Sequence, residues 1–553
     1  MRLDIAILNG FLIDGAGNPW FRADVGVLEN KIVRIGSISK DNADKVIDAT
    51  GSYVTPGFID AHSHSDHVYI VHPKADSMVR QGITTEVVGN CGTSAYPIMG
   101  KGAEIWRSTY ASLFIDSSTV SMDWSTLSNY REKVGRQGLP VNLVPLVGHG
   151  SVRSCVIGTE NRTPTNDEME EMKSLVREAM RDGAFGMSSG LVYLPGCWAK
   201  TDELVTLARV VAEHGGIYTS HVRGERETIV EADAEAIEIG RRAGVPVEIS
   251  HNGPKYGGWG KSKETLPLME KAREEWIDVT FDNDTHTYLE TSVGGDTLPQ
   301  WLVDKSDEEK LRILANPEKR KQIRNEMITD PFPRQGPAGP LKHQAFERIV
   351  VFHAPRNRAL IGKSIKEMAN ARNVDPWEAY FDLFVEERGN EALITDYMDE
   401  SELQAISKHP LFMFCSDGSA TSKELDQKRL CVPLGMCSYG EYANILRRWV
   451  REKNVLSLQE AIRKCTSFPA QRFGLLDRGL LRPGMIADIV VFDLEKMRDN
   501  ATNLWPHNYP FENYPPDYAQ GVRHVIVNGK IAVEENEFTG RLSGRCLDKR
   551  EYL

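Results

Sequence analysis

The sequence lacks long hydrophobic runs and contains few cysteines. None of its 553 residues lies in a stretch that approaches the roughly 18 consecutive apolar residues of a transmembrane helix. Residues 1–10 carry charges at Arg2 and Asp4, which predicts neither a signal peptide nor a membrane span there. The eight cysteines form no CxxC pair, so they indicate neither a disulfide framework nor a zinc finger. We therefore expect a protein of the reducing cytoplasm.

Positive charge is also in deficit, because 66 Lys and Arg residues face 78 Asp and Glu residues, for a net charge of −12. An acidic chain is a poor candidate for binding nucleic acid or an anionic membrane surface. Hydrophobic residues at 41% and charged residues at 26% are typical of a globular protein and argue against disorder. We expect a small molecule as the partner, with no nucleic acid and no membrane. The sequence leaves the oligomeric state open, a homo-oligomer included.

Both ends of the chain read as β-structure. Residues 1–55 alternate short apolar runs with turn signals such as Asn9-Gly10 and show no helical pattern. Residues 481–553 are similar, with a hairpin pattern about Asn528-Gly529. We expect the two ends to join in one small β-sandwich or β-barrel domain.

The middle of the chain, residues 56–480, alternates helices and strands. Helical patterns occupy 166–182, 202–214 and 228–243, and strand patterns occupy 217–221 and 245–251. This alternation predicts βαβ units and an α/β fold, a TIM-type (β/α)8 barrel. The segment at about 285–345 is less regular and rich in charge, Pro and Gly, so we expect it to be an insertion or lid on the barrel.

The sharpest local feature is a His-x-His pair, His62 and His64, at the end of the apolar run 56–61. On a strand, residues two apart face the same side, so both imidazoles can reach one metal ion. The alternative is two polar residues in a loop. The position at a strand end favours the metal, because catalytic groups of barrels sit at the carboxyl ends of strands.

His221 and His251 each end a predicted strand, about one βα repeat apart. They should therefore lie on neighbouring strands at the same barrel mouth as His62 and His64. Either histidine alone could be a satisfied, half-buried side chain. Four histidines placed alike favour a metal site.

Two further strands end in residues that can bind metal. Cys91 follows the apolar run 87–88, and a thiolate binds zinc strongly; the alternative is a small buried hydrophobe. Asp417 follows the run 412–415, where a carboxylate can bind a metal and take a proton from activated water. Its alternative is a turn or helix-capping aspartate.

Taken together, these motifs resemble the amidohydrolase superfamily and, within it, the D-aminoacylase (N-acyl-D-amino-acid deacylase) family. The resemblance runs nearly end to end. It rests on 54–64, 88–92, 148–150, 187–196, 218–223, 249–251, 416–418, 466–474 and 479–493.

The resemblance implies a zinc-dependent hydrolase with one tight metal site and a second, weaker one. Cys91, His221 and His251 match the tight site. His62, His64 and Asp417 match the weaker site, and Cys91 is placed to bridge the two. Asp417 matches the general base, and Tyr193 matches a tyrosine that holds or polarises the scissile carbonyl.

The sequence departs from the family at the expected substrate cation. Family members carry His-Pro-Arg soon after the Ser-Asp-Gly strand, and this arginine grips the substrate carboxylate; the stretch 430–439 has no such residue. Lys255, Arg223 and Arg429 are candidate replacements. His149 and Tyr288 are further candidates for substrate binding. Cys415 and Cys437, near the site, suggest a more apolar pocket.

Three functions remain in competition. The leading expectation is hydrolysis of a linear amide, with an N-acyl-D-amino acid as the default substrate. The alternative is hydrolysis of a cyclic amide, imide, ester or lactone on the same site. A catalytically dead scaffold would be expected to have lost ligands, and every expected ligand type is present.

Overall fold

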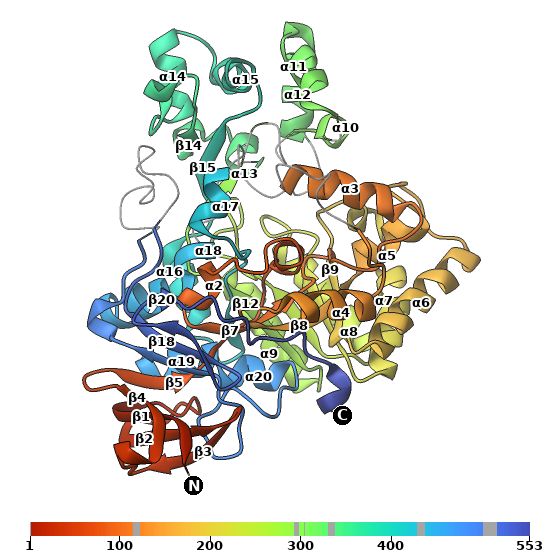
Figure 1. Ribbon diagram of the computed structural model, residues 1–553. Helices are drawn as coiled ribbons and strands as arrows, with labels where there is room; N and C mark the ends of the chain where they lie inside the picture. The colour runs from red at the N-terminus through yellow and green to blue at the C-terminus, as the bar shows by residue number, and fades with distance from the viewer. Residues whose placement is uncertain are drawn as a thin grey trace.

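The computed structural model describes most of the chain (Figure 1). The described residues are 2–113, 122–291, 293, 298–303, 305–329, 338–428, 437–500 and 517–552. Among these residues, no helix has the length and the apolar character needed to cross a bilayer.

Eight parallel strands form the central sheet. In order around the sheet they are β6 (Phe58–Asp60), β7 (Ile83–Val88), β8 (Asn142–Gly148), β9 (Gly186–Gly190), β10 (Ile217–His221), β11 (Val247–Ser250), β12 (Val279–Asn283) and β16 (Phe412–Phe414). The strands are almost entirely buried, as expected when helices cover a parallel sheet.

The first and last strands meet just beyond their carboxyl ends. Ser63 and Gly418 form a parallel bridge, and the His64 amide donates to the Gly418 carbonyl at 2.8 Å. The Asp417 amide donates to the His62 carbonyl at 3.0 Å. These bonds close the sheet into the predicted barrel and bring two of the candidate site segments together.

Helices cover the outside of the barrel. The three helices predicted from periodicity are confirmed as α6 (Asn166–Arg181), α7 (Thr201–Glu213) and α8 (Ile229–Ala243). A capping box of Thr165 and Glu168 begins α6, and Gly244 in the left-handed conformation ends α8. The remaining helices of the barrel region are α1 (Asp66–Tyr69), α2 (Ser77–Arg80), α3 (Gly102–Leu113), α4 (Leu127–Gln137), α5 (His149–Val156), α9 (Ser262–Glu274), α16 (Glu400–Ser407), α17 (Lys423–Lys428), α18 (Cys437–Asn444), α19 (Leu458–Cys465) and α20 (Ser467–Arg472).

Both chain ends build one nine-stranded sheet beside the barrel, as predicted. The amino-terminal part supplies β1 (Leu3–Leu12), β2 (Phe21–Leu28), β3 (Lys31–Gly36), β4 (Ala43–Asp48) and β5 (Tyr53–Pro56). The carboxy-terminal part supplies β17 (Ile489–Phe492), β18 (Val522–Val527), β19 (Lys530–Glu534) and β20 (Glu537–Phe538). Antiparallel pairing of β5 with β17 joins the two parts, over a shared apolar core that includes Val54 and Ile489.

Between β12 and β16 the chain leaves the barrel and forms a unit with its own sheet and core. The sheet consists of β13 (Tyr288–Thr291), β14 (Ile349–His353) and β15 (Ala392–Asp396). Its helices are α10 (Gln300–Val303), α11 (Asp307–Leu314), α12 (Pro317–Thr329), α13 (Ala338–Lys342), α14 (Ile365–Arg372) and α15 (Pro376–Glu387). In Figure 1 this unit stands above the barrel, and a separate hydrophobic cluster around Trp377 stabilises it.

This insertion therefore runs to Asp396, well past the range of about 285–345 in which the sequence predicted it. The physical reason is local. The segment from β14 to α15 consists of a regular apolar strand and amphipathic helices, so from sequence it looks like another βα repeat of the barrel.

Candidate functional site

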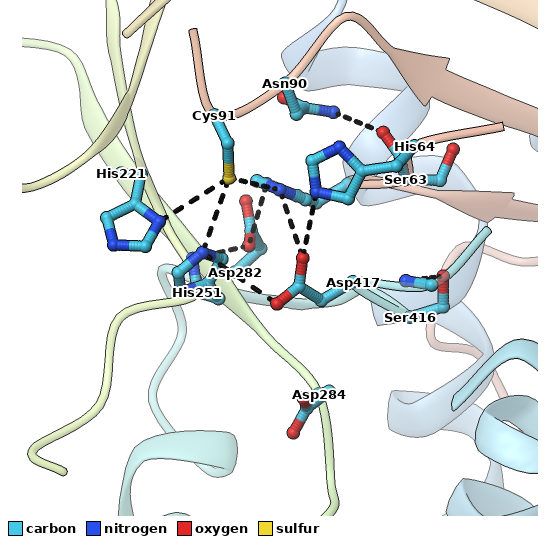
Figure 2. A network of polar contacts seen from close by, with 12 residues as sticks. Ser63, His64, Asn90, Cys91, His221, His251, Asp282, Asp284, Ser416 and Asp417 are labelled. Atoms are coloured by element: carbon cyan, nitrogen blue, oxygen red, sulfur yellow. Dashed lines mark hydrogen bonds and ion pairs between the residues drawn. The ribbon is translucent and has the colours of Figure 1, made fainter. Parts of the chain in front are cut away.

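The thiol of Cys91 lies at the centre of a cluster of histidines at the mouth of the barrel (Figure 2). Its Sγ is 3.3 Å from His62 Nε2, 3.5 Å from His221 Nδ1 and 3.6 Å from His251 Nε2. Each residue comes from or directly follows a different barrel strand. The carboxyl ends of β6, β7, β10 and β11 therefore converge on one sulfur.

Asp417 approaches the same histidines from beyond β16. Its Oδ1 lies 3.2 Å from His64 Nε2 and 3.4 Å from His62 Nε2, and its Oδ2 lies 3.8 Å from His251 Nε2. The structure thus brings together all six residues that the sequence singled out as metal ligands. We call His62, His64, Cys91, His221, His251 and Asp417 the Cys91 cluster.

The backbone is unusual at three of these six positions. Cys91, His251 and Asp417 have φ values of 52°, 24° and 49°, in a region that non-glycine residues rarely occupy. Such conformations cost about 1–3 kcal/mol each and are found where the surrounding fold enforces them, often at functional sites. The strand-end turns therefore aim these side chains inward against the local preference of the chain.

The electrostatics of the cluster fit a metal ion. Burial favours a neutral thiol, yet His62 and His64 outweigh it and hold the pKa of Cys91 well below its usual value. Burial would also raise the pKa of Asp417, but His251 and the other histidines lower it to about 2. Burial opposes a charged His64, whereas the charges of Cys91 and Asp417 raise its pKa to about 10. The two anionic groups thus attract positive charge to the space between them, which protons or a metal cation can supply.

Two buried carboxylates behind the cluster orient its histidines. Glu225 Oε1 lies 3.0 Å from His251 Nδ1, and Glu225 Oε2 lies 3.5 Å from His221 Nε2. Asp282 Oδ1 accepts a hydrogen bond from the His251 amide at 2.9 Å and lies 3.9 Å from His62 Nδ1. Carboxylates placed in this way fix the ring orientation of metal-binding histidines.

Sequence reasoning missed both of these carboxylates. Asp282 carried a usable signal, because it lies near the end of the apolar strand β12, much as Asp417 follows β16. Glu225 lies in a loop four residues after His221, where no periodicity marks it.

Tyr193 lies beside the cluster. Its ring centroid is 4.9 Å from that of His221, with the rings at 70°. His149 is buried at the start of α5, and its Nε2 lies 2.9 Å from Glu203 Oε1, which also accepts a hydrogen bond from Arg153. These contacts join His149 to α7. The structure thus places Tyr193 beside the Cys91 cluster, whereas His149 pairs with Glu203 instead.

The candidate substrate cations are held by protein groups. Arg223 forms a two-bond pair with Glu235, at 2.9 and 3.0 Å, and donates to the carbonyls of Cys197 and Ala199. Lys255 is buried, donates to the His251 carbonyl at 3.1 Å and lies 3.8 Å from Glu225. Arg429 lies outside the described residues.

Tyr288 lies on β13 of the insertion. It lines a cavity of about 310 Å³ together with Glu347, Arg348, Val350, Ile394 and Asp396. Its predicted contact with substrate would therefore come from the insertion rather than from the barrel.

Comparisons with known proteins agree with this architecture. The model of the amidohydrolase family matches residues 45–533. The chain is 33% identical to an N-acyl-D-glutamate deacylase from Alcaligenes xylosoxydans xylosoxydans over 532 residues, 96% of this chain and 93% of the relative. It is also 33% identical to a D-aminoacylase of the same organism, over 98% of this chain and 97% of the relative.

A solved structure extends the similarity to three dimensions. The N-acyl-D-glutamate deacylase of Bordetella bronchiseptica, complexed with zinc and a phosphonate inhibitor, superposes with a TM-score of 0.77 at 29% identity. The match covers 99% of this chain and 100% of that one. With a family match over most of its length and relatives similar from end to end, the chain belongs to the amidohydrolase family and is a hydrolase.

Proposed function

We propose that this protein is a zinc-dependent hydrolase that cleaves a linear amide, with an N-acyl-D-amino acid as its substrate. The observation that carries the proposal is the convergence of one thiol, four imidazoles and one carboxylate at the barrel mouth. The names of the deacylases that the chain resembles support the substrate class, and the zinc complex of one of them supports the metal.

The residues of the Cys91 cluster divide into two sets in this proposal. Cys91, His221 and His251 would hold the tighter zinc ion. His62, His64 and Asp417 would form a weaker site, and Cys91 lies among the histidines of both sets. A zinc ion bound among such ligands lowers the pKa of water and polarises a carbonyl group.

The protein's own groups then position the reactants and move the proton. Asp417 is ionised at neutral pH because its neighbouring histidines lower its pKa to about 2. Its carboxylate accepts a proton from the attacking water and passes it to the amide nitrogen, which leaves as an amine. Tyr193, beside His221, donates a hydrogen bond from its hydroxyl to the acyl oxygen as negative charge develops there.

A competing proposal keeps the same site but changes the substrate to a cyclic amide, imide, ester or lactone. It is favoured by the pairing of Arg223 with Glu235 and of Lys255 with Glu225. A substrate carboxylate needs a fixed cation, and these two candidates already neutralise protein carboxylates. A ring substrate without a free carboxylate would not need one.

A substrate panel separates the two proposals. The zinc-loaded protein is incubated with N-acyl-D-amino acids, their L-enantiomers, cyclic amides and lactones, and amine or acid release is measured. Turnover of N-acyl-D-amino acids supports the first proposal. Turnover of ring substrates alone rejects it in favour of the second.

A further inference from the structure

A second group of histidine, cysteine and acidic side chains lies at the base of the insertion. His286 follows β12, Cys437 and Glu441 belong to α18, and Asp284 and Asp499 lie beside them. His286 Nδ1 is 2.6 Å from Glu441 Oε2 and 3.4 Å from Cys437 Sγ, which is 3.9 Å from Asp284 Oδ2. We call these five residues the Cys437 cluster; it shares no residue with the Cys91 cluster.

The charges of the Cys437 cluster are unbalanced. Glu441 and Asp499 are fully buried, Asp284 is 8% exposed, and His286, the one basic side chain of the cluster, is 5% exposed. Several carboxylates taken out of water need compensating positive charge. The imidazole of His286 pairs with Glu441, and a divalent cation bound among these donors would compensate the buried Asp284 as well.

The hydrogen bonding points the same way. His286 Nδ1 carries at most one hydrogen, so it cannot donate to both Glu441 and Cys437. His286 Nε2 is buried and makes no hydrogen bond; Asp499 Oδ2 lies 3.9 Å from it. His286, Cys437 and Glu441 thus bring an imidazole nitrogen, a sulfur and a carboxylate oxygen within 4.8 Å of one another.

The surrounding chain holds these donors in place. Glu441 Oε1 accepts hydrogen bonds from the amide and the hydroxyl of Thr285, at 2.8 and 2.7 Å, which leaves Oε2 directed to His286. A side chain at Gly440 would place its Cβ only 2.0 Å from Asp499 Oδ1, so the glycine is what lets this buried carboxylate approach α18. Oriented ligands of this kind are the preorganisation that a metal site requires.

We propose that His286, Cys437 and Glu441, with Asp284 or Asp499 as a further oxygen ligand, bind one divalent ion of the zinc class. A mixed nitrogen, sulfur and oxygen donor set suits zinc better than magnesium or calcium. When the ion binds, the Cys437 thiol loses its proton to solvent, and the resulting thiolate coordinates the ion. This site goes beyond the proposed function and does not depend on it.

The position of the site gives it a structural role. Thr287, next to His286, accepts hydrogen bonds from the amides of Tyr397 and Met398, so the two connections of the insertion to the barrel meet here. An ion held by His286 and α18 would fasten this junction to the carboxy-terminal part of the barrel.

Metal analysis of a variant that lacks the first site tests the proposal. In full-length protein carrying Cys91→Ala, His62→Ala, His64→Ala, His221→Ala and His251→Ala, which removes the ligands of both metal positions proposed in the Cys91 cluster, we expect about one zinc ion per chain after dialysis. Adding Cys437→Ser or His286→Gln should remove it, whereas Cys155→Ser, a buried cysteine on α5, should not. In the variant that lacks the first site, cobalt should give a thiolate charge-transfer band, and adding Cys437→Ser should abolish it.

A second measurement does not depend on whether the variants with added substitutions fold, because it uses the first-site variant alone. In the first-site variant, zinc should slow alkylation of Cys437 at least tenfold relative to chelator-treated protein, as followed by mass spectrometry. A first-site variant without zinc, or a Cys437 alkylation rate that zinc does not change, would overturn the proposal.

Discussion

The Cys91 cluster and the Cys437 cluster use the same donor types but differ in access and in backbone strain. In the Cys91 cluster the side chains of His64 and Asp417 are each 26% exposed and the other four residues are buried, whereas in the Cys437 cluster only Cys437 is partly exposed. Three of the six residues in the first have positive φ, and none of the five in the second does. Catalytic metal sites keep an open position and structural sites are closed, so the more exposed and more strained Cys91 cluster fits the catalytic role proposed for it, and the Cys437 cluster fits a structural one.

The largest effect is expected in the Cys91 cluster, for the loss of the carboxylate that carries the proton. Asp417→Asn should lower kcat by roughly 10²–10⁴-fold, because it removes the group that accepts and returns the proton. The matched substitution Asp399→Asn changes the partly exposed cap of α16 and should leave kcat within about twofold. Steady-state kinetics on the substrate found in the panel measures both, and full activity in Asp417→Asn would reject the assignment of the base.

A smaller effect is expected behind the same cluster. Glu225→Gln removes the charge that orients His221 and His251, and should weaken zinc affinity by about 10–100-fold. Excess zinc should then restore most of the activity, which separates a positioning role from a catalytic one. Glu235→Gln, which disturbs Arg223 instead, is the control. Competition with a fluorescent chelator gives the affinities; equal values for the two variants would contradict the role of Glu225.

The difference between the clusters also explains how far the sequence could predict them. The six residues of the Cys91 cluster end or follow barrel strands, and the rule that barrel sites lie at strand ends is enough to gather them. His286, Cys437 and Asp499 lie in a loop, a helix start and a distant segment, which only tertiary packing brings together. Cys437 was expected near the site as an apolar side chain, without its histidine and acidic partners.

The fold followed the same division. The alternation of β10, α8 and β11 was regular enough to predict, and so was the union of the two chain ends. The length of the insertion was not, because β14 and α15 have the same periodicity as barrel elements. Periodicity identifies an element but does not say which core it packs against, and here the core around Trp377 decides.

Hydrogen exchange can test the structural role proposed for the Cys437 cluster. If zinc fastens the base of the insertion, its removal should raise amide exchange rates in β13 and β15 several-fold, with little change in β8 and β9. Cys437→Ser should show the fast rates with or without zinc. The control Cys155→Ser should behave like the unmodified protein. If exchange in β13 and β15 does not depend on zinc, the structural role proposed for the Cys437 cluster is wrong.

The smallest effect concerns a buried carboxylate that belongs to neither cluster. Asp233, on α8, is fully buried, and its Oδ1 accepts a hydrogen bond from Asn252 at 2.8 Å. Burial, with a further contribution from Glu225, raises its pKa to about 8 from the usual 3.8. Between these values the folded protein holds a proton that the unfolded chain has lost. The contribution of Asp233 to stability is therefore complete below about pH 4 and is lost as the pH rises towards 8.

Asp233→Asn should abolish this dependence, because an amide does not titrate. As the pH is raised from 6 to 8, the urea concentration at the unfolding midpoint should decrease in the unmodified protein. It should decrease less in the variant. Relative to the unmodified protein, the variant should gain about 1–3 kcal/mol in its free energy of unfolding when the pH is raised from 6 to 8. Asp399→Asn, at a partly exposed cap, should keep the slope of the unmodified protein. Parallel slopes for Asp233→Asn and the unmodified protein would mean that Asp233 is ionised at neutral pH. In that case burial alone would not keep the Asp233 carboxyl group protonated, and Asp233 would be ionised at neutral pH like Asp417 of the Cys91 cluster.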